Sequence, residues 1–233
     1  NQRSGVFNLG TEGIMMLSAF VGFFVVYSLG SAILGILAAM AIGGLMGLLM
    51  ALVSVTFKAQ QGISGIGLYM FGWGVSGTLF RVYVGGVTNI DGIGKIAVPV
   101  LQDIPVIGQI LFNQNPMVYL AYLLVPVASY VLFKTAWGLK VRAVGTTPQA
   151  ADTLGISVEK IRYQCVTLGG IMSGLAGAYL SIGQAQMFAD NLTAGRGFIA
   201  VALVYFGRWK PTGVMAGALL FSMAHALQRS IQV

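Results

Sequence analysis

Charged residues are the scarcest class in this sequence. Aspartate, glutamate, lysine and arginine together make up 8% of the 233 residues, whereas hydrophobic residues make up 57% and the mean hydropathy is +0.84. A typical soluble domain carries about a quarter charged residues. This scarcity excludes an ordinary soluble domain, and the composition predicts a chain that lies in a lipid bilayer.

Residues that commonly carry catalysis or bind metals are also rare. Cys165 and His225 are the only cysteine and histidine, so the sequence offers neither an internal disulfide nor a histidine metal site. The segment "DGIGKI" at residues 91–96 lacks the leading glycine and the following serine or threonine of a P-loop, and "GISGIG" and "GVSGTL" miss the GxSxG spacing. These absences argue against an ATP site and against a membrane enzyme.

In place of charge, the sequence has long uncharged runs, at residues 13–57, 59–80, 104–133, 163–189 and 211–228. About 20 residues span the hydrocarbon core, so the first run must hold two spans, with the turn near residues 27–31. The pattern predicts an all-α fold, a polytopic transmembrane helical bundle of about six spans. These lie near 14–27, 33–57, 62–80, 117–133, 163–188 and 213–228, and a shorter half-helix or re-entrant segment lies at 198–207.

The positions of the basic residues predict the orientation. Lysine and arginine are retained on the cytoplasmic side of membrane proteins, so the net charge of +7 does not indicate nucleic acid. With the N-terminus inside, the cytoplasmic set is Arg3, Lys58, Lys134, Lys140, Arg142, Lys160 and Arg162, and the outer set is Arg81, Lys95 and Arg196. Arg208 and Lys210 lie inside if residues 198–207 cross the membrane and outside if they re-enter, which leaves the side of the C-terminus open.

The main cytoplasmic loop is predicted at residues 134–162, which hold five of the 13 basic residues. Within it Pro148 suits the first position of a short helix and Gly155 suits the position after its end. A helix of about two turns is marginal by itself in water, so it must dock on something, either a cytoplasmic partner or the end of the bundle. The residues predicted to share its small apolar face are Ala150, Ala151 and Leu154.

Glycine is abundant, with 33 residues that lie mostly inside the uncharged runs. Membrane helices use small residues four apart to approach one another closely. Three GxxxG pairs are predicted to act in this way: Gly43 with Gly47, Gly170 with Gly174, and Gly213 with Gly217.

Three stretches resemble a known family: "RSGVFNLGTEGIMMLSA" (residues 3–19), "GLKVRAVGTTPQAADTLGIS" (138–157) and "GRGFIAVALVYFGRWKPTGVMAGALLFSMAHALQ" (195–228). They are similar to the permease subunits of bacterial ABC importers, in the branch for simple sugars and nucleosides, from the same superfamily as branched-chain amino acid and ribose permeases. The resemblance implies one permease domain over residues 1–233, with a coupling loop at 134–162 and an external loop at 81–116. Family members usually carry further spans before "GVFNLG", so it also implies that the N-terminal span or spans are missing here.

The resemblance further implies how transport is driven. This chain would carry no cofactor, because ATP and Mg²⁺ bind to separate ABC ATPase subunits in the cytoplasm. The other partners would be a second permease subunit, identical or different, an external solute-binding protein and the lipid bilayer of the bacterial inner membrane, with no nucleic acid. The likeness of residues 81–116 to the nucleoside branch favours nucleosides over simple sugars. The residues that match the family's coupling pattern are Arg142, Ala143, Gly145, Pro148, Ala150, Ala151, Gly155 and Ile156.

Four polar residues are candidates for the substrate path: Asn8, Glu12, Asp190 and Arg196. Asn8 and Glu12 are four apart and can present polar groups on one helix face to a substrate hydroxyl or base edge, while capping or packing is the other interpretation of both. Asp190 and Arg196 flank the outer end of the fifth span and are predicted either to pair with each other or to serve an outer gate.

A self-contained secondary transporter is the alternative function, because intramembrane acids such as Glu12 or Asp190 can carry protons. Such a transporter would need no ATPase.

Overall fold

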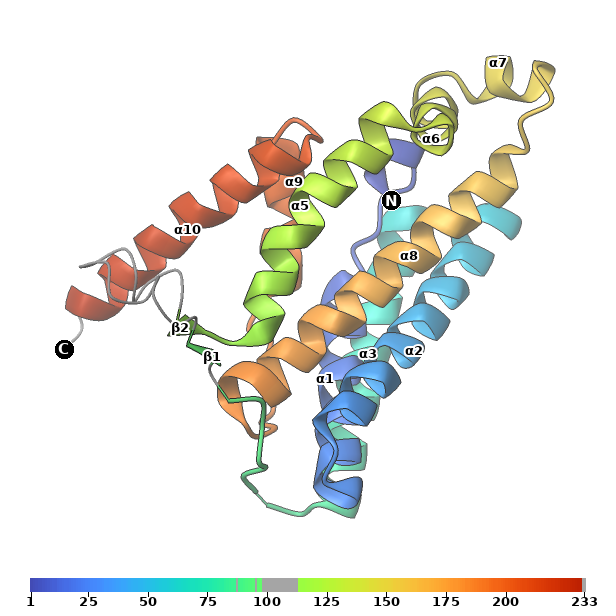
Figure 1. The fold of residues 1–233 in the computed structure, drawn as a ribbon. Coiled ribbons are helices and arrows are strands. Elements are labelled where there is room, and N and C mark those ends of the chain that lie inside the picture. The colour runs from blue at the N-terminus through green and yellow to red at the C-terminus, as the bar shows by residue number, and fades with distance from the viewer. Residues whose placement is uncertain (87, 95, 98–112, 232–233) are drawn as a thin grey trace.

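The computed structural model describes residues 1–86, 88–94, 96–97 and 113–231 (Figure 1). Most of the described chain is helical, as predicted. The helices are α1 (Thr11–Leu29), α2 (Ala32–Ala51), α3 (Gln61–Tyr83), α5 (Pro116–Lys134), α6 (Ala136–Thr146), α7 (Pro148–Thr153), α8 (Val158–Ala178), α9 (Arg196–Phe206) and α10 (Pro211–Ile231). Wider helical turns extend α2 through Leu52–Thr56 and α8 through Tyr179–Ala185, and the strands β1 (Ile96–Ala97) and β2 (Asn113–Gln114) form a short antiparallel pair.

Five described helices are long and apolar enough to cross a membrane, and they coincide with the first five predicted spans. They are α1, α2 with its extension, α3, α5, and α8 with its extension. α10 covers the sixth predicted span with 21 residues but is not among the five, so the count of six is not confirmed. α9 has 11 residues, too few to cross by itself, which agrees with the predicted half-helix.

Helix α1 lies at the centre of the bundle and packs against α2, α3 and α8 (Figure 1). Ile14, Ala19 and Phe23 on this helix are completely buried. A helix that is apolar on every side suits a position surrounded by other helices. By contrast, α2 exposes leucines such as Leu37 and Leu45, as expected for a helix that faces lipid on one side. The turn between the two helices ends α1 at Gly30, which adopts the left-handed conformation (φ 68°).

The crossing of α2 and α8 is built from glycines. A Cβ atom added to Gly43 would lie 2.5 Å from the carbonyl oxygen of Gly170 and 2.8 Å from the Cα atom of Gly174. A Cβ atom on Gly47 would lie 3.1 Å from the Cα atom of Gly170. The two backbones therefore touch directly, which confirms that these two GxxxG pairs mediate close packing. The third pair also faces a neighbour, because Gly213 packs against the backbone of Gly207 at the end of α9.

The two ends of the bundle differ in charge. Arg3 and Arg142 line one cavity at the end where the chain begins, and Lys58 and Arg162 line another cavity beside α7 at the same end. Figure 1 shows α6, α7 and the connection between α2 and α3 there. This grouping agrees with the basic set predicted for the cytoplasmic side.

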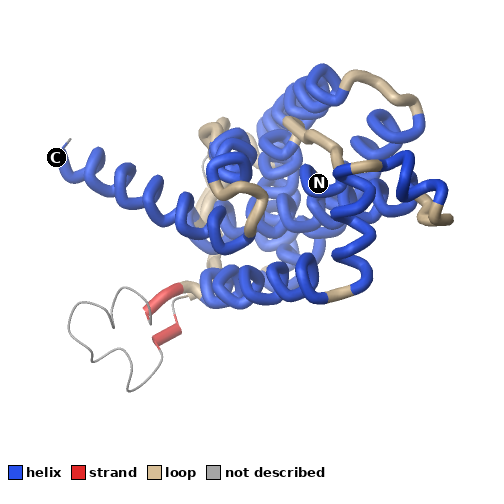
Figure 2. The backbone as a smooth tube through the Cα atoms, turned by 90° about the horizontal axis from the view of Figure 1, so that it is seen from above, coloured by secondary structure: helices blue, strands red, loops and turns tan. Residues whose placement is uncertain are grey.

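Helix α9 runs toward this basic end. The Nε atom of Arg3 donates a hydrogen bond to the carbonyl oxygen of Trp209 at 3.3 Å, so the turn that carries Arg208 and Lys210 lies beside Arg3. Residues 198–207 therefore reach the basic end and do not re-enter toward the opposite one. From this turn α10 runs back toward the level of β1 and β2 (Figure 1), and seen from above it extends away from the other helices (Figure 2).

The predicted external loop at residues 81–116 lies partly outside the described residues. The described parts of this segment lie at the end opposite to α7. There Ile90 N–H donates to the carbonyl oxygen of Gln186 at 2.9 Å, and Asn115 caps α5 by accepting from Met117 N–H at 3.0 Å.

Candidate functional site

The chain between α8 and α9 is an irregular turn inside an otherwise helical bundle. Asn191, Ala194 and Gly195 all have positive φ values, of 62°, 45° and 80°. This turn begins beside the C-terminal end of α3, where Asp190 meets Arg81. It places the N-terminus of α9 against Glu12 in the first turn of α1. A broken span leaves backbone N–H groups unpaired, and these need acceptors inside the protein.

Glu12 supplies those acceptors. Its Oε1 atom accepts from Thr193 Oγ1 at 2.6 Å and from Gly195 N–H at 2.8 Å, and its Oε2 atom accepts from Gly197 N–H. The side chain is 2% exposed. The carboxylate thus sits on the N-terminus of α9, where the helix dipole favours negative charge. Of the two interpretations of Glu12, the geometry supports capping and packing, with both oxygens occupied.

The glycines at this contact are necessary for its geometry. A Cβ atom on Gly197 would lie 2.6 Å from the Cα atom of Glu12 and 2.7 Å from its Oε2 atom, so only glycine lets the two helix starts meet. Sequence reasoning missed Thr193, Gly195 and Gly197 as partners of Glu12. The one feature of the sequence that pointed to a close contact here was Gly195 and Gly197 on either side of Arg196, and it does not indicate which acidic residue lies nearby.

The predicted pairing of Asp190 with Arg196 is wrong. Asp190 Oδ2 pairs instead with Arg81 Nη2 at 3.1 Å, on an exposed surface at the end of α3. Arg196 Nη1 donates to the carbonyl oxygen of Leu192 at 3.0 Å, within its own turn. An exposed ion pair such as Arg81 with Asp190 contributes about 0–1 kcal/mol.

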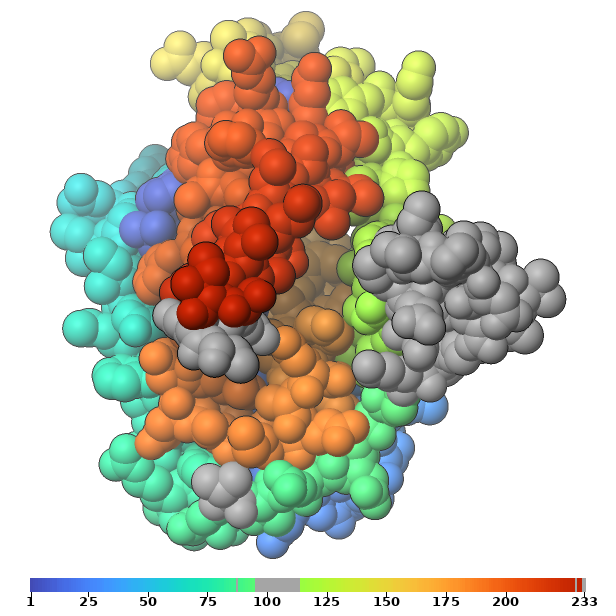
Figure 3. Space-filling model, turned by 90° about the vertical axis from the view of Figure 1, so that its left-hand side faces the viewer, coloured from blue at the N-terminus to red at the C-terminus, as the bar shows by residue number. Residues whose placement is uncertain are grey.

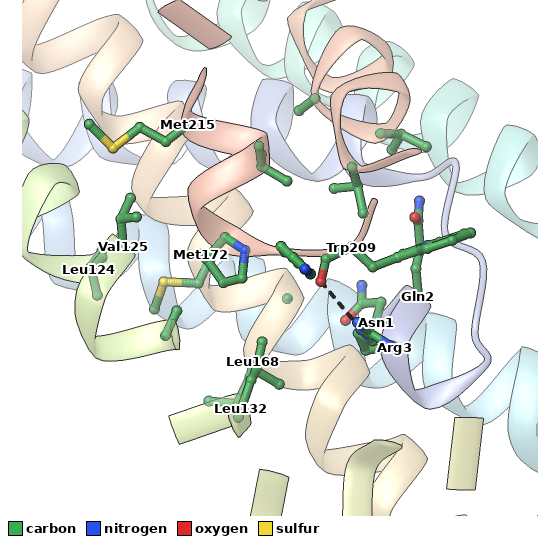
Figure 4. Close-up of a pocket in the computed structure, with 18 of the residues that line it drawn as sticks. Asn1, Gln2, Arg3, Leu124, Val125, Leu132, Leu168, Met172, Trp209 and Met215 are labelled. Carbon is green, nitrogen blue, oxygen red and sulfur yellow. Dashed lines mark hydrogen bonds between the residues drawn. The ribbon is translucent and has the colours of Figure 1, made fainter. Parts of the chain in front are cut away.

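A cavity with a volume of about 750 Å³ lies among α5, α8, α9 and α10. Figure 3 shows the hollow between α10 and α5 on one face of the molecule. Most of its walls are apolar, with Leu124, Val125, Met172 and Met215 near one another in Figure 4. Polar residues gather at the basic end, where Figure 4 shows Asn1, Gln2 and Arg3 beside Trp209. An apolar cavity with a few convergent polar groups is the usual form of a small-molecule site.

Asn8 is the one predicted path residue that lines this cavity. It is 3% exposed, and its Oδ1 atom accepts from Gly10 N–H at 2.8 Å. Its Nδ2 atom donates to no acceptor among the described residues. Asn8 therefore combines a structural acceptor with an unused donor at the cavity wall, whereas Glu12, Asp190 and Arg196 do not line the cavity.

The loop predicted to couple transport forms two short helices, α6 and α7, at the basic end. Arg142, Ala143 and Gly145 lie on α6, Pro148, Ala150 and Ala151 lie on α7, and Gly155 and Ile156 follow α7. Gly155 has φ 75°, as expected for the residue after a helix end. The guanidinium of Arg142 lies 5.4 Å from the ring centroid of Phe133, and Gly145 packs against the backbone of Arg3.

The predicted apolar face of α7 is only partly correct. Ala151 is 2% exposed and packs with Val141, Val144 and Ile161, whereas Leu154 is 79% exposed. Ala150 is exposed as well. The helix docks on its own bundle through Ala151 and turns Leu154 outward, because α7 ends at Thr153 and the chain has already left the helical face. Docking on the end of the bundle is thus observed, against α6 and α8, whereas docking on a cytoplasmic partner stays a prediction.

A bundle with five helices that are long and apolar enough to cross a membrane is typical of a multi-pass membrane protein. The family model described as "Branched-chain amino acid transport system / permease component" matches residues 2–232, and the chain belongs to this family. It is 40% identical over 242 residues to the guanosine ABC transporter permease protein NupQ of Bacillus subtilis, covering 97% of this chain and 74% of the relative. It is also 40% identical over 238 residues to the nucleoside ABC transporter permease protein NupC of Lactococcus lactis, with the same coverage.

A third relative is the putative glucose ABC transporter permease protein TsgC13 of Haloferax volcanii. The identity is 38% over 232 residues, covering 98% of this chain and 70% of the relative. No solved structure matches the chain. The chain is therefore an ABC transporter permease subunit, a transport component and not an enzyme, and it acts with an ATPase and other ABC components.

Proposed function

We propose that this chain forms the membrane passage of an ABC importer for nucleosides or a related sugar-containing solute. The observation that carries the proposal is the cavity of about 750 Å³, whose apolar walls and polar end suit a molecule with a flat base and a hydroxylated sugar. Two relatives with 40% identity are named for guanosine and for nucleosides, and a third is named for glucose.

The partners proposed are ATPase subunits that carry ATP and Mg²⁺, a second permease subunit, and an external solute-binding protein at the end that carries Arg81. The basic end faces the cytoplasm of a bacterium, so α6 and α7 meet the ATPase there. Residues 134–162 serve as the coupling loop, and this chain itself holds no cofactor. ATP-driven movement of the ATPase is transmitted through α7 to α6 and α8, because the buried Ala151 of α7 packs against residues of both helices.

A reconstitution experiment separates this function from a secondary transporter. The full-length protein with its co-purified partners is placed in proteoliposomes, and uptake of labelled guanosine and of labelled glucose is measured with ATP or with an ion gradient. ATP-dependent uptake of guanosine supports the proposal. Uptake by this chain alone, driven by a proton or sodium gradient, would replace it with the alternative.

Leu154 provides a test of the coupling loop. We expect Leu154→Glu to reduce ATP-dependent uptake at least about tenfold and to weaken retention of the ATPase, because it places a charge on an exposed apolar side chain at the outer side of α7. The thermal unfolding midpoint should stay near wild type. The control is Gln149→Glu, which adds the same charge at an exposed polar position. Equal losses in both variants would contradict a specific contact through Leu154.

Asn8 provides a test of the passage. In Asn8→Asp the oxygen that accepts from Gly10 N–H is kept, whereas the Nδ2 donor at the cavity wall is lost. We expect the KM for the transported nucleoside to rise about tenfold, the effect of one missing hydrogen bond to a polar ligand. Asn8→Ser, which restores a donor, should recover part of the affinity. An unchanged KM in Asn8→Asp would remove Asn8 from the passage.

A further inference from the structure

A second, smaller cavity lies at the basic end, between the N-terminal turn, α6 and the end of α9. Its volume is about 350 Å³. The side chains that give it its chemistry are those of Arg3, Arg142, Thr146, Tyr205 and Trp209. We call it the arginine cavity. Neither the coupling loop nor the larger cavity explains why two guanidinium groups line one small space.

The two arginines share an aromatic neighbour, and no acidic side chain among the described residues pairs with either of them. The Cζ atoms of Arg3 and Arg142 lie 5.8 Å and 5.4 Å from the ring centroid of Phe133. The Nε atom of Arg3 donates to the carbonyl oxygen of Trp209 at 3.3 Å, and the Nε atom of Arg142 donates to the carbonyl oxygen of Gly138 at 3.4 Å. Their terminal nitrogens donate to no described residue, and the salt bridge found among the described residues, Arg81 with Asp190, lies at the other end. Two half-buried like charges in this arrangement favour a bound anion.

The depth of the cavity indicates which anion. Trp209 and Tyr205 lie at the basic end of α9, and their rings pack edge to face with centroids 5.5 Å apart. Tryptophan and tyrosine concentrate at the level of the lipid headgroups, and basic pockets between helices on the cytoplasmic side bind anionic headgroups. Guanidinium groups hold phosphate oxygens by paired hydrogen bonds.

We propose that the arginine cavity binds a phosphate group, and that this phosphate belongs to an anionic phospholipid of the cytoplasmic leaflet. The headgroup joins α6, which begins the coupling loop, to the turn between α9 and α10, which borders the larger cavity. Anionic lipid thereby stabilises the junction between these two parts of the subunit.

Lipid retention and thermal unfolding test the proposal without any transport assay. The purified full-length protein is placed in nanodiscs of phosphatidylcholine, with or without phosphatidylglycerol. We expect phosphatidylglycerol to raise the unfolding midpoint. Arg3→Gln should weaken its retention about tenfold, the effect of one lost charge-assisted hydrogen bond, and Arg3→Lys should lie between Arg3→Gln and wild type. The matched control is Arg208→Gln, which removes the same charge at the same end from an exposed residue outside the cavity.

Three outcomes would overturn the proposal. Equal losses in Arg3→Gln and Arg208→Gln would show general surface attraction. Full stabilisation by inorganic phosphate in pure phosphatidylcholine would identify a free anion as the ligand. An unchanged response to phosphatidylglycerol in Arg3→Gln, together with lost binding of the ATPase subunit, would assign the arginines to a protein partner.

Discussion

Replacing Glu12 with alanine is expected to lower the thermal unfolding midpoint of the purified protein by about 10 °C. The change removes the acceptor of Thr193 Oγ1, Gly195 N–H and Gly197 N–H in a site from which water is largely excluded. Each buried donor left unsatisfied costs about 1–3 kcal/mol, and 1 kcal/mol shifts the midpoint by about 2–4 °C in a chain of this size. The broken span should then open at the N-terminus of α9.

Limited proteolysis of the turn at residues 186–195, together with the unfolding midpoint, measures this opening. Glu12→Gln is the matched variant: it keeps one oxygen but places an amide donor against a backbone N–H group, so we expect an intermediate loss. Transport should fall with stability in both variants. If Glu12→Ala unfolds at the wild-type temperature but no longer transports, then Glu12 acts in the passage and its capping of α9 is secondary.

The second large effect is expected at the crossing of α2 and α8. In Gly43→Ala the new Cβ atom would lie 2.5 Å from the carbonyl oxygen of Gly170, so the two backbones must separate. Overpacking of a close contact costs about 1–3 kcal/mol, and Gly43→Leu should exceed that range because it separates the helices along their whole contact. The measurement is the unfolding midpoint of each variant in the same detergent.

Gly74 on α3 is the control for this pair, because a Cβ atom there meets no atom within 4 Å. Gly74→Ala should leave the midpoint unchanged or raise it slightly, since alanine is favoured over glycine in a helix by about 1 kcal/mol. A comparable loss in Gly74→Ala and Gly43→Ala would mean that the loss at Gly43 does not come from its contact with α8.

Hydropathy was sufficient to locate the spans. The predicted segment 14–27 falls inside α1, and the predicted segment 33–57 ends one residue beyond the extended α2. The turn between them begins at Gly30, because uncharged length and small turn residues are local properties. The glycine pairs at Gly43 and Gly170 were also predictable, since close approach of membrane helices requires small residues four apart.

The details of the polar site were not predictable in the same way. The sequence distance between Asp190 and Arg196 suggested a pair, but Asp190 meets Arg81, which is 109 residues away. For α7 the composition indicated one apolar face, yet Ala151 is buried and Leu154 is exposed, because the helix ends after a single docked turn.

The sequence by itself determined that this chain is a membrane bundle, where its spans lie, which end is basic and which transporter family it belongs to. Each of these depends on composition or on contiguous motifs. Only the tertiary structure decided what Glu12 does, which way α9 runs and which polar groups line a cavity. Those properties depend on contacts between residues as far as 185 positions apart for Glu12 with Gly197 and 206 for Arg3 with Trp209, and such hydrogen bonds exist only once the helices have packed.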